Sequence, residues 1–236
     1  MEIIGRSDTG RVRQNNEDAW TQDSDLGVAV LADGMGGLDA GEVASDQALV
    51  AIMDHLRAAG QLDSGCISAA INAANRRVYE LAQGDARLNN MGTTVVLWAA
   101  LGGDRFVLGH VGDSRAYRIN QLGLERLTRD HSVVQTMVDD GVLTEAQAHT
   151  APNRNVITRA IGLAVSVEVE VAEYARAADD VFLLCSDGLS DMLGLEELTE
   201  LCRGATRGRL AELAERLVQA ANDAGGSDNI TVVLLS

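Results

Sequence analysis

The stretch "GTTVVLWAALGGDRFVLGHVGDSRAYRIN", residues 92–120, decides the fold class. Its two apolar runs, 92–101 and 105–113, are joined by a Gly-Gly-Asp sequence that is typical of a hairpin connection. A third strand-like run, 114–120, follows directly and ends at a turn over residues 121–123. Strands that succeed one another without intervening helices indicate antiparallel pairing rather than a parallel sheet.

Apolar residues at helical spacing lie on both sides of this stretch. Residues 41–59 and 64–83 each present one apolar face, and the second is expected to begin at a Ser64 cap and to stop at Gly84. A third apolar face runs through 210–221. Further strands are expected at residues 26–33, 165–174, 180–187 and 229–236. The whole pattern indicates an α+β fold of antiparallel sheets covered by helices.

The segment 131–160 is more polar than its surroundings and holds the single proline, Pro152. An apolar cluster near its start predicts a short helix that ends near Gly141, and Thr144 with Gln147 forms a capping-box pattern for another. We interpret this segment as a small helical flap over one end of the sheets. No proline-rich or serine-rich linker interrupts the chain, so a single domain over residues 1–236 is expected.

Composition excludes several classes of function. The net charge of −16 argues against nucleic acid and anionic membranes as partners, because both require basic patches. The sequence has no lysine, which codon bias would explain, and this removes P-loop nucleotide binding and Schiff-base catalysis. Aromatic residues make up only 3% of the chain, so the core is expected to consist of Ala, Val, Leu and Ile.

Cysteine usage and the N-terminal residues bear on the cellular compartment. Cys66, Cys185 and Cys202 are few and far apart, which argues against a disulfide framework and a zinc site. The first ten residues, "MEIIGRSDTG", lack the charged and apolar regions of a signal peptide. No apolar run approaches the length that spans a membrane. We therefore expect a cytoplasmic protein.

Four aspartates stand at the ends of apolar strand-like runs. They are Asp33, Asp113, Asp187 and Asp228. Each one alone is best explained as a helix cap or an Asx turn. Together, at one end of stacked sheets, they would repel one another unless cations intervened. Carboxylate ligands suit Mg²⁺ or Mn²⁺, so the set favours a binuclear metal site, with Glu17 and Asp18 as a fifth acidic locus.

Other phosphate chemistries lack the residues that they need. A cysteine phosphatase built on Cys185 would need an arginine six positions later, where Asp191 stands. A phospho-acceptor receiver domain needs a late lysine, and the chain has none. A phosphatase that forms an aspartyl phosphate needs a paired Asp-x-Asp after a strand, whereas Asp23-Ser24-Asp25 precedes one. Water activated by metal ions is left as the expected nucleophile if the protein is an enzyme.

Eight motifs follow one another along the chain: "RQNNEDAW", "LADGMGG", "GTTVV", "HVGDSRAY", "LTRDHS", "NVITRAIG", "LCSDGLSD" and "GGSDNITVV". In this order they resemble the metal-dependent protein serine/threonine phosphatases of type 2C, the PPM family, and its compact bacterial members most. The resemblance covers the chain from Gly5 to its end. It implies a central sandwich of two antiparallel sheets flanked by helices. It also implies two Mn²⁺ or Mg²⁺ ions, with a weaker third.

The resemblance assigns a role to each acidic position. Asp33 matches the carboxylate that bridges both metals, and the Gly34 carbonyl matches a further ligand. Asp187 and Asp228 match the remaining direct ligands. Three more acidic residues complete the match: Glu17 and Asp18, which orient metal-bound water, and Asp113, which shares the third ion with Asp187.

Arg13, four residues before Glu17, matches the arginine that binds the substrate phosphate. Without the motif around it, Arg13 would be interpreted as a surface residue. Eukaryotic relatives often carry histidine where this chain has Met35, so the proton donor to the leaving group is unassigned. A metal-bound water is one candidate. We interpret the four histidines, His55, His110, His131 and His149, as structural.

The implied reaction is hydrolysis of phosphoserine and phosphothreonine esters by a water that two metal ions activate. The expected partners are phosphorylated proteins and an opposing bacterial serine/threonine kinase, and the chain is expected to act as a monomer. A catalytically weak phosphoprotein-binding module on the same fold is the alternative. Loss of a metal-ligating aspartate would favour that alternative, and none is lost. A Ca²⁺ sensor is a second rival, but the EF-hand spacing is absent.

Overall fold

The computed structural model describes residues 1–37 and 40–236, and two antiparallel sheets form its centre. The first sheet has the strand order β1 (Ile3–Asp8), β11 (Ile230–Leu235), β10 (Val181–Cys185), β7 (Arg115–Asn120) and β8 (Gly123–Arg126). The second has the order β2 (Asp18–Asp23), β3 (Val28–Met35), β5 (Val95–Ala100), β6 (Arg105–Val111) and β9 (Glu170–Ala175), with β4 (Gly92–Thr93) paired to β3. The strands pair antiparallel in both sheets, as predicted.

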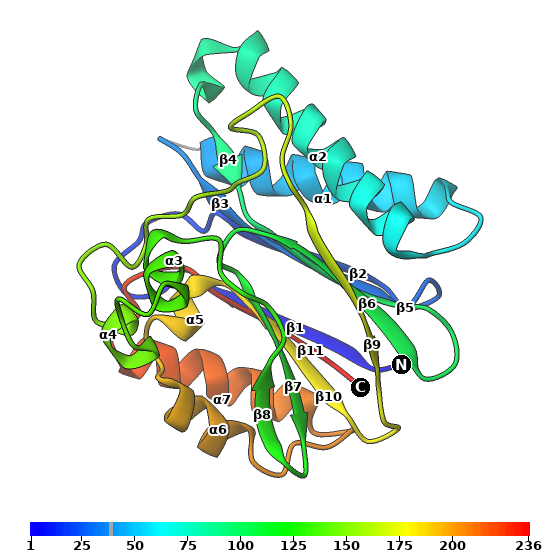
Figure 1. The fold of residues 1–236 in the computed structure, drawn as a ribbon, viewed down its shortest axis with the longest axis vertical. Helices are drawn as coiled ribbons and strands as arrows, with labels where there is room; N and C mark the ends of the chain where they lie inside the picture. The colour runs from blue at the N-terminus through cyan, green and yellow to red at the C-terminus, as the bar shows by residue number, and fades with distance from the viewer. Residues whose placement is uncertain (38–39) are drawn as a thin grey trace.

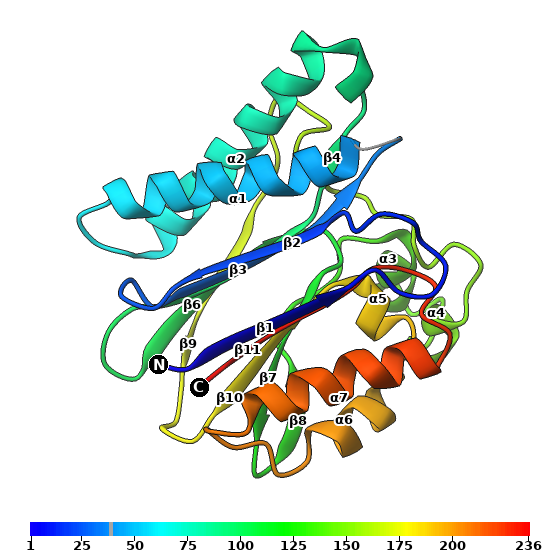
Figure 2. The same cartoon turned by 180° about the vertical axis from the view of Figure 1, so that it is seen from behind.

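Helices cover the outer face of each sheet (Figure 1). The long helices α1 (Ala40–Ala58) and α2 (Ser64–Gly84) lie on the second sheet, and α6 (Leu195–Cys202) and α7 (Leu210–Asp223) lie on the first. Short elements complete the fold: η1 (Ala86–Leu88), α3 (Val133–Asp139), α4 (Glu145–His149) and α5 (Asp187–Ser190). Seen from behind, the two termini lie together at one end of the sandwich, and α3 to α5 lie at the other (Figure 2).

The core has three layers of different composition. The two helix-facing layers are almost wholly aliphatic, as expected. The layer between the sheets instead contains Trp98, Phe106 and Phe182, whose ring centroids lie 4.6 to 5.4 Å apart. The expectation of an entirely aliphatic core is therefore wrong for this layer. Both phenylalanines of the chain lie here, where two sheet faces leave room for rings.

Local boundaries differ from the predictions at three places. The cap of α2 is Asp63 rather than Ser64, since its carboxylate accepts a hydrogen bond from the Cys66 N–H at 2.8 Å. Strand β9 begins only at Glu170, which is paired with His110 near the end of β6. Asp33 is not the last residue of its strand, since β3 continues to Met35 through the short pairing with β4.

Candidate active site

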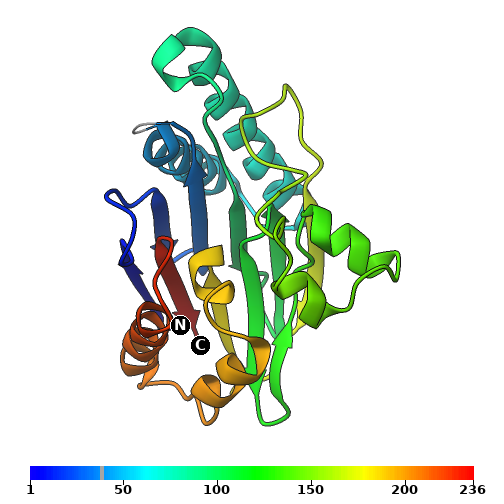
Figure 3. The same cartoon turned by 90° about the vertical axis from the view of Figure 1, so that its left-hand side faces the viewer.

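The predicted carboxylates gather at one end of the sandwich, where segments far apart in sequence meet. Asp18 and Asp33 are register partners on β2 and β3. Asp187 follows β10 and opens α5, and Asp228 stands two residues before β11, the neighbour of β10 in the sheet. This end carries α5 and the helical segment 131–160, with α5 in yellow beside the green helices (Figure 3).

Burial and mutual repulsion raise the pKa values of these groups. Burial holds the pKa of Asp33 well above its usual range, and the charges of Asp18 and Asp187 add to this effect. The pKa of Asp187 is likewise well above its usual range, first through burial and then through the charges of Asp113 and Asp191. The ionised cluster is therefore unfavourable in the absence of cations.

The other two shifted carboxyls belong to the same cluster. Burial raises the pKa of Asp18 to about 7, against the hydrogen bond from Ser186 that lowers it. Burial also raises the pKa of Asp113 to about 7, with the nearby Asp130 charge contributing. The charge of Asp113 raises the pKa values of both Asp33 and Asp187, so Asp113 lies near both carboxylates.

One buried oxygen in this cluster lacks the hydrogen-bond donor that a water on a nearby cation would supply. Asp18 Oδ2 accepts a hydrogen bond from the Ser186 hydroxyl at 2.7 Å. Its other oxygen, Oδ1, is buried and has no hydrogen-bond partner among the described residues. An unpaired buried carboxylate oxygen is costly, and oxygen ligands of this kind suit Mg²⁺ or Mn²⁺. The residues present therefore fit the metal ions that the resemblance implies.

Gly34 is required by close packing rather than by a sharp turn. Its N–H donates to the Glu17 carbonyl at 3.1 Å, and a side chain at this position would collide with the carbonyl of Gly41 in the first turn of α1. Gly34 still lies in β3, so the chain does not leave the strand at this position. The backbone here is held between the 9–17 loop and α1.

Asn229 is a site residue that sequence reasoning missed. Its side chain accepts the Glu17 N–H at 2.8 Å and donates to the carbonyls of Thr9 and Asn15 at 3.0 and 2.9 Å. These bonds fasten the N-terminal loop next to Asp228. Its position directly after Asp228 was the available signal, but the contacts join segments more than 200 residues apart and leave no local pattern.

Arg13 lies on that fastened loop and reaches the predicted metal site. Its Nη2 donates to Asp228 Oδ2 at 2.7 Å, and its side chain remains 51% exposed. The guanidinium therefore stands at the open side of the carboxylate cluster.

Asp191 is a second residue that the sequence reasoning did not assign. It is the C-cap residue of α5, four positions after Asp187, and its charge raises the pKa values of Asp187 and Asp113. The i, i+4 spacing of the two aspartates was the available signal. Asp191 Oδ2 also accepts a hydrogen bond from Arg154 Nε at 3.1 Å, which ties segment 131–160 to the carboxylate cluster.

A cavity of about 620 Å³ opens beside these carboxylates. Asp113, Asp187 and Asp191 line it together with residues of segment 131–160 and of α6. Ser190, which is 2% exposed, also lines it, and its hydroxyl has no hydrogen-bond partner in the described structure. The cavity thus continues directly from the predicted metal site.

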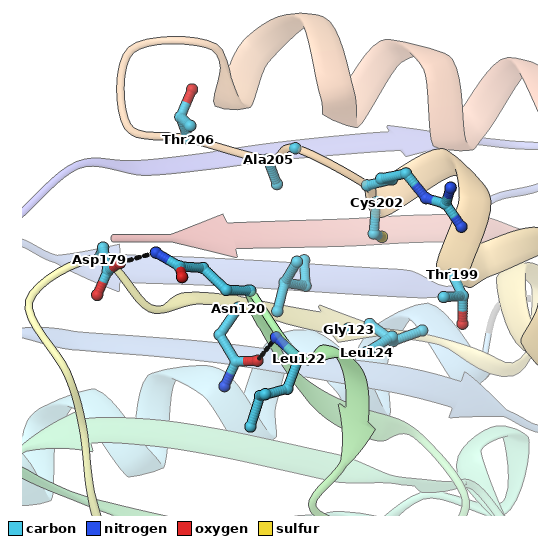
Figure 4. Close-up of a pocket in the computed structure, with 13 residues that line it drawn as sticks. Asn120, Leu122, Gly123, Leu124, Asp179, Thr199, Cys202, Ala205 and Thr206 are labelled. Atoms are coloured by element: carbon cyan, nitrogen blue, oxygen red, sulfur yellow. Dashed lines mark hydrogen bonds between the residues drawn. The ribbon is translucent and has the colours of Figure 1, made fainter.

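A second cavity, of about 500 Å³, lies at the opposite end of β10 (Figure 4). The β7–β8 turn and the residues after α6 line it, and Asp179 is its single carboxylate. Asp179 accepts a hydrogen bond from Gln121 at 3.4 Å. None of the predicted site residues contributes to it.

His110, His131 and Glu170 are close enough to suggest a separate metal site, since their ligand atoms lie within 4.8 Å of one another. The hydrogen bonds argue against it. The Gly112 N–H donates to His131 Nδ1 at 3.1 Å, so the neutral ring carries its proton on Nε2. That nitrogen lies 3.4 Å from both Glu170 Oε2 and Arg159 Nη1, and a guanidinium beside it disfavours a bound cation. This geometry is consistent with the structural interpretation of both histidines.

Comparison with known proteins decides the family. The family model for protein phosphatase 2C matches residues 5–234. The chain belongs to the protein phosphatase 2C family. The resemblance read from the eight motifs is thereby confirmed, and so is the fold that it implied.

Two curated bacterial phosphatases illustrate the similarity. The serine/threonine phosphatase Stp of Listeria monocytogenes is 34% identical, over 98% of this chain and 93% of its own length. The serine/threonine protein phosphatase PstP of Mycobacterium tuberculosis is 41% identical over 99% of this chain, which spans only 44% of PstP.

Solved structures of this phosphatase family superpose closely. The crystal structure of Mycobacterium tuberculosis PstP matches with a TM-score of 0.90 and 38% identity, covering 99% of this chain and 97% of that one. The PstP catalytic domain in complex with two manganese ions matches with a TM-score of 0.85 and 36% identity, covering 99% and 96%. Within the described residues, no helix of this phosphatase is long and apolar enough to cross a membrane.

Proposed function

We propose that this member of the protein phosphatase 2C family hydrolyses phosphoserine and phosphothreonine esters of proteins with the help of two Mn²⁺ or Mg²⁺ ions. The observation that carries the proposal is the cluster of buried, mutually repelling carboxylates with the unpartnered Asp18 Oδ1. The relative PstP, whose catalytic domain is described in complex with two manganese ions, supports the choice of cation.

Each site residue has a proposed role in holding the ions. Asp33 would bind both cations from β3, with the Gly34 carbonyl, Asp187 and Asp228 as the remaining protein ligands. Glu17 and Asp18 would orient water on the ions. Asp113 would bind a weaker third cation next to Asp187, a pairing supported by the effect of the Asp113 charge on the Asp187 pKa.

When bound, two such cations lower the pKa of water, supply a nucleophile near neutral pH and neutralise charge on the phosphoryl oxygens. The carboxylates of this chain hold them in place, and their combined positive charge reconciles a phosphate substrate with a net charge of −16. Arg13 extends from the open side and holds the phosphate through paired N–H donors. The partners we propose are phosphoproteins and the bacterial serine/threonine kinase that produces them.

The test is turnover of a phosphothreonine peptide and of p-nitrophenyl phosphate with Mn²⁺, with Mg²⁺ and in excess chelator. Hydrolysis that needs a divalent cation and ceases in chelator is the expected result. Full activity in chelator would overturn the two-metal proposal. Binding of phosphopeptide without turnover in either metal would instead favour the binding-module alternative.

A further inference from the structure

Thr94, which lies between β4 and β5, makes two hydrogen bonds to the residue proposed to bridge the metals. The Thr94 N–H donates to the Asp33 carbonyl at 2.9 Å, and the Asp33 N–H donates to Thr94 Oγ1 at 3.1 Å. Thr94 is only 2% exposed, so water does not offer a ready alternative to these bonds. Thr94 therefore holds the backbone on both sides of the Asp33 carboxylate, and the Thr93 hydroxyl also donates to the Asp33 carbonyl, at 2.9 Å.

The same Thr94 hydroxyl also reaches the segment that carries Asp113. Its oxygen lies 2.6 Å from the Ser114 hydroxyl, which is 1% exposed and directly follows Asp113 in the chain. A hydroxyl has one proton to donate and two lone pairs to accept, so it can serve the Asp33 N–H and Ser114 together. One buried oxygen thus joins two carboxylate-bearing segments from different strand ends.

The Thr94 methyl group packs against the turn before Asp113. A side chain at Gly112 would place its Cβ only 2.6 Å from Thr94 Cγ2, and Gly112 has a φ of +106°, a conformation that favours glycine. On its other side, Gly112 is held by His131, through a donated N–H at 3.1 Å and an accepted one at 3.0 Å. The turn that carries Asp113 is thereby fixed between Thr94 and His131.

We propose that the Thr94 hydroxyl is a positioning group of the active site, which sets the spacing between the Asp33 carboxylate and the Asp113 turn. This inference rests on the proposed metal-dependent function. Buried carboxylates that repel one another move apart unless their backbones are held, and Mg²⁺ and Mn²⁺ sites require well-defined octahedral geometry. Thr94 does not touch substrate or cation. It acts through the two segments that it joins.

The experiment compares four variants that separate the hydroxyl from the methyl group and from general burial. Thr94→Val keeps the shape and removes the hydroxyl, whereas Thr94→Ser keeps the hydroxyl and removes the methyl. Ser114→Ala removes the second hydroxyl. Thr128→Val is the matched control, because Thr128 is also buried and its hydroxyl also accepts a backbone N–H, from Ala116 at 3.0 Å, without joining site carboxylates.

The measurements are Mn²⁺ binding by calorimetry, thermal unfolding in chelator, and turnover of a phosphothreonine peptide as a function of Mn²⁺. Thr94→Val is expected to weaken Mn²⁺ binding by about tenfold, because the buried Asp33 N–H loses the Thr94 hydroxyl as its acceptor. Thr94→Ser should stay close to wild type in Mn²⁺ affinity. Thr128→Val should lower the unfolding temperature and leave Mn²⁺ affinity unchanged. Ser114→Ala should weaken Mn²⁺ binding less than Thr94→Val does. The double variant that combines Thr94→Val with Ser114→Ala should bind Mn²⁺ no more weakly than Thr94→Val alone.

Three outcomes would overturn the inference. Equal Mn²⁺ affinities of Thr94→Val and wild type would show that the hydroxyl positions nothing. Equal losses in Thr94→Val and Thr94→Ser would assign the effect to packing, and a loss in Thr128→Val would assign it to reduced stability. If Thr94→Val fails to fold, unchanged Mn²⁺ affinity in Ser114→Ala overturns the inference. Absence of Mn²⁺ binding or turnover in the wild type would instead reject the proposed function itself.

Discussion

The two ends of strand β10 each border a cavity, and the two cavities differ in chemistry far more than in size. At the end where Asp187 follows the strand, the cavity measures about 620 Å³ and four aspartates line it, namely Asp113, Asp130, Asp187 and Asp191. At the end where Asp179 precedes the strand, the cavity measures about 500 Å³, and Asp179 is its single carboxylate among the described residues. Both are framed by helices and turns at the margins of the same sheet.

The difference teaches that volume does not identify the functional end. What distinguishes the Asp187 end is that the fold holds carboxylates there against desolvation and mutual repulsion, with pKa values raised accordingly. It also leaves the hydroxyl of Ser190 and one oxygen of Asp18 without partners among the described residues. Such costs persist in a structure when a ligand compensates for them, and none of the described residues that line the Asp179 cavity has a buried side-chain polar atom without a partner.

The largest effect is expected from Asp33→Asn at the carboxylate end. The amide keeps the shape of the side chain and loses the charge that would bridge two cations, so kcat should fall on the order of a thousandfold. Because burial and neighbouring carboxylates raise the pKa of Asp33, its charge destabilises the metal-free fold. The variant should therefore unfold in chelator at a higher temperature than wild type.

Paired assays of turnover and unfolding temperature check both statements. Near-normal kcat with two Mn²⁺ bound would show that Asp33 does not bridge the ions. An inactive variant that is also less stable in chelator would point to a damaged fold instead of a lost ligand.

The next largest effect is expected from Asp113→Ala, and it should depend on the leaving group. Removing Asp113 takes away the site of the third cation, which we expect to assist protonation of the leaving alkoxide. Turnover of a phosphothreonine peptide should fall on the order of a hundredfold, as for loss of a general acid. The aryl oxide of p-nitrophenyl phosphate needs little protonation, so its hydrolysis should fall much less. Equal losses on both substrates would contradict the leaving-group role.

Arg13→Ala is expected to have a smaller effect that is confined to substrate. Loss of a charge-assisted hydrogen bond to phosphate should lower kcat/KM roughly ten- to a hundredfold. Calorimetry should show largely unchanged Mn²⁺ affinity, because Arg13 contacts Asp228 from the exposed side. An unchanged kcat/KM would leave Arg13 as a surface residue that merely pairs with Asp228.

Much of the fold and of the carboxylate cluster could be predicted from the sequence. Hairpin connections and helical periodicity are local signals, and they identified most strands of both sheets and three long helices. Asp113, Asp187 and Asp228 were recognisable because each follows or precedes an apolar strand, a position that topology brings to one end. The strand expected over residues 165–174 begins too early, because β9 starts at Glu170. In the structure, the carbonyls of Ala164 and Val165 accept hydrogen bonds from the Asn75 side chain instead of from a strand.

The residues that hold the carboxylates were not predictable in the same way. Ser186 bonds to Asp18 across 168 positions and Thr94 bonds to Asp33 across 61. A serine or threonine makes such bonds in any buried setting, so its identity alone carries no information about its partner. The sequence therefore indicates which groups would bind cations, whereas only the folded structure indicates what positions them.

The smallest effect comes from a matched pair of leucines, one at each end of β10. Leu195 lines the carboxylate-end cavity and is 58% exposed, while Leu122 lines the other cavity and is 98% exposed. If a phosphoprotein segment extends from the metal site into the first cavity, Leu195→Ser should raise the KM for phosphopeptides about fivefold, the equivalent of roughly 1 kcal/mol of apolar burial. Hydrolysis of p-nitrophenyl phosphate, which is too small to reach α6, should not change. Leu122→Ser should alter neither substrate's kinetics. Equal effects of both variants would show that the cavity beside Asp187 does not contact the substrate, and that any loss arises from the exposed leucine itself.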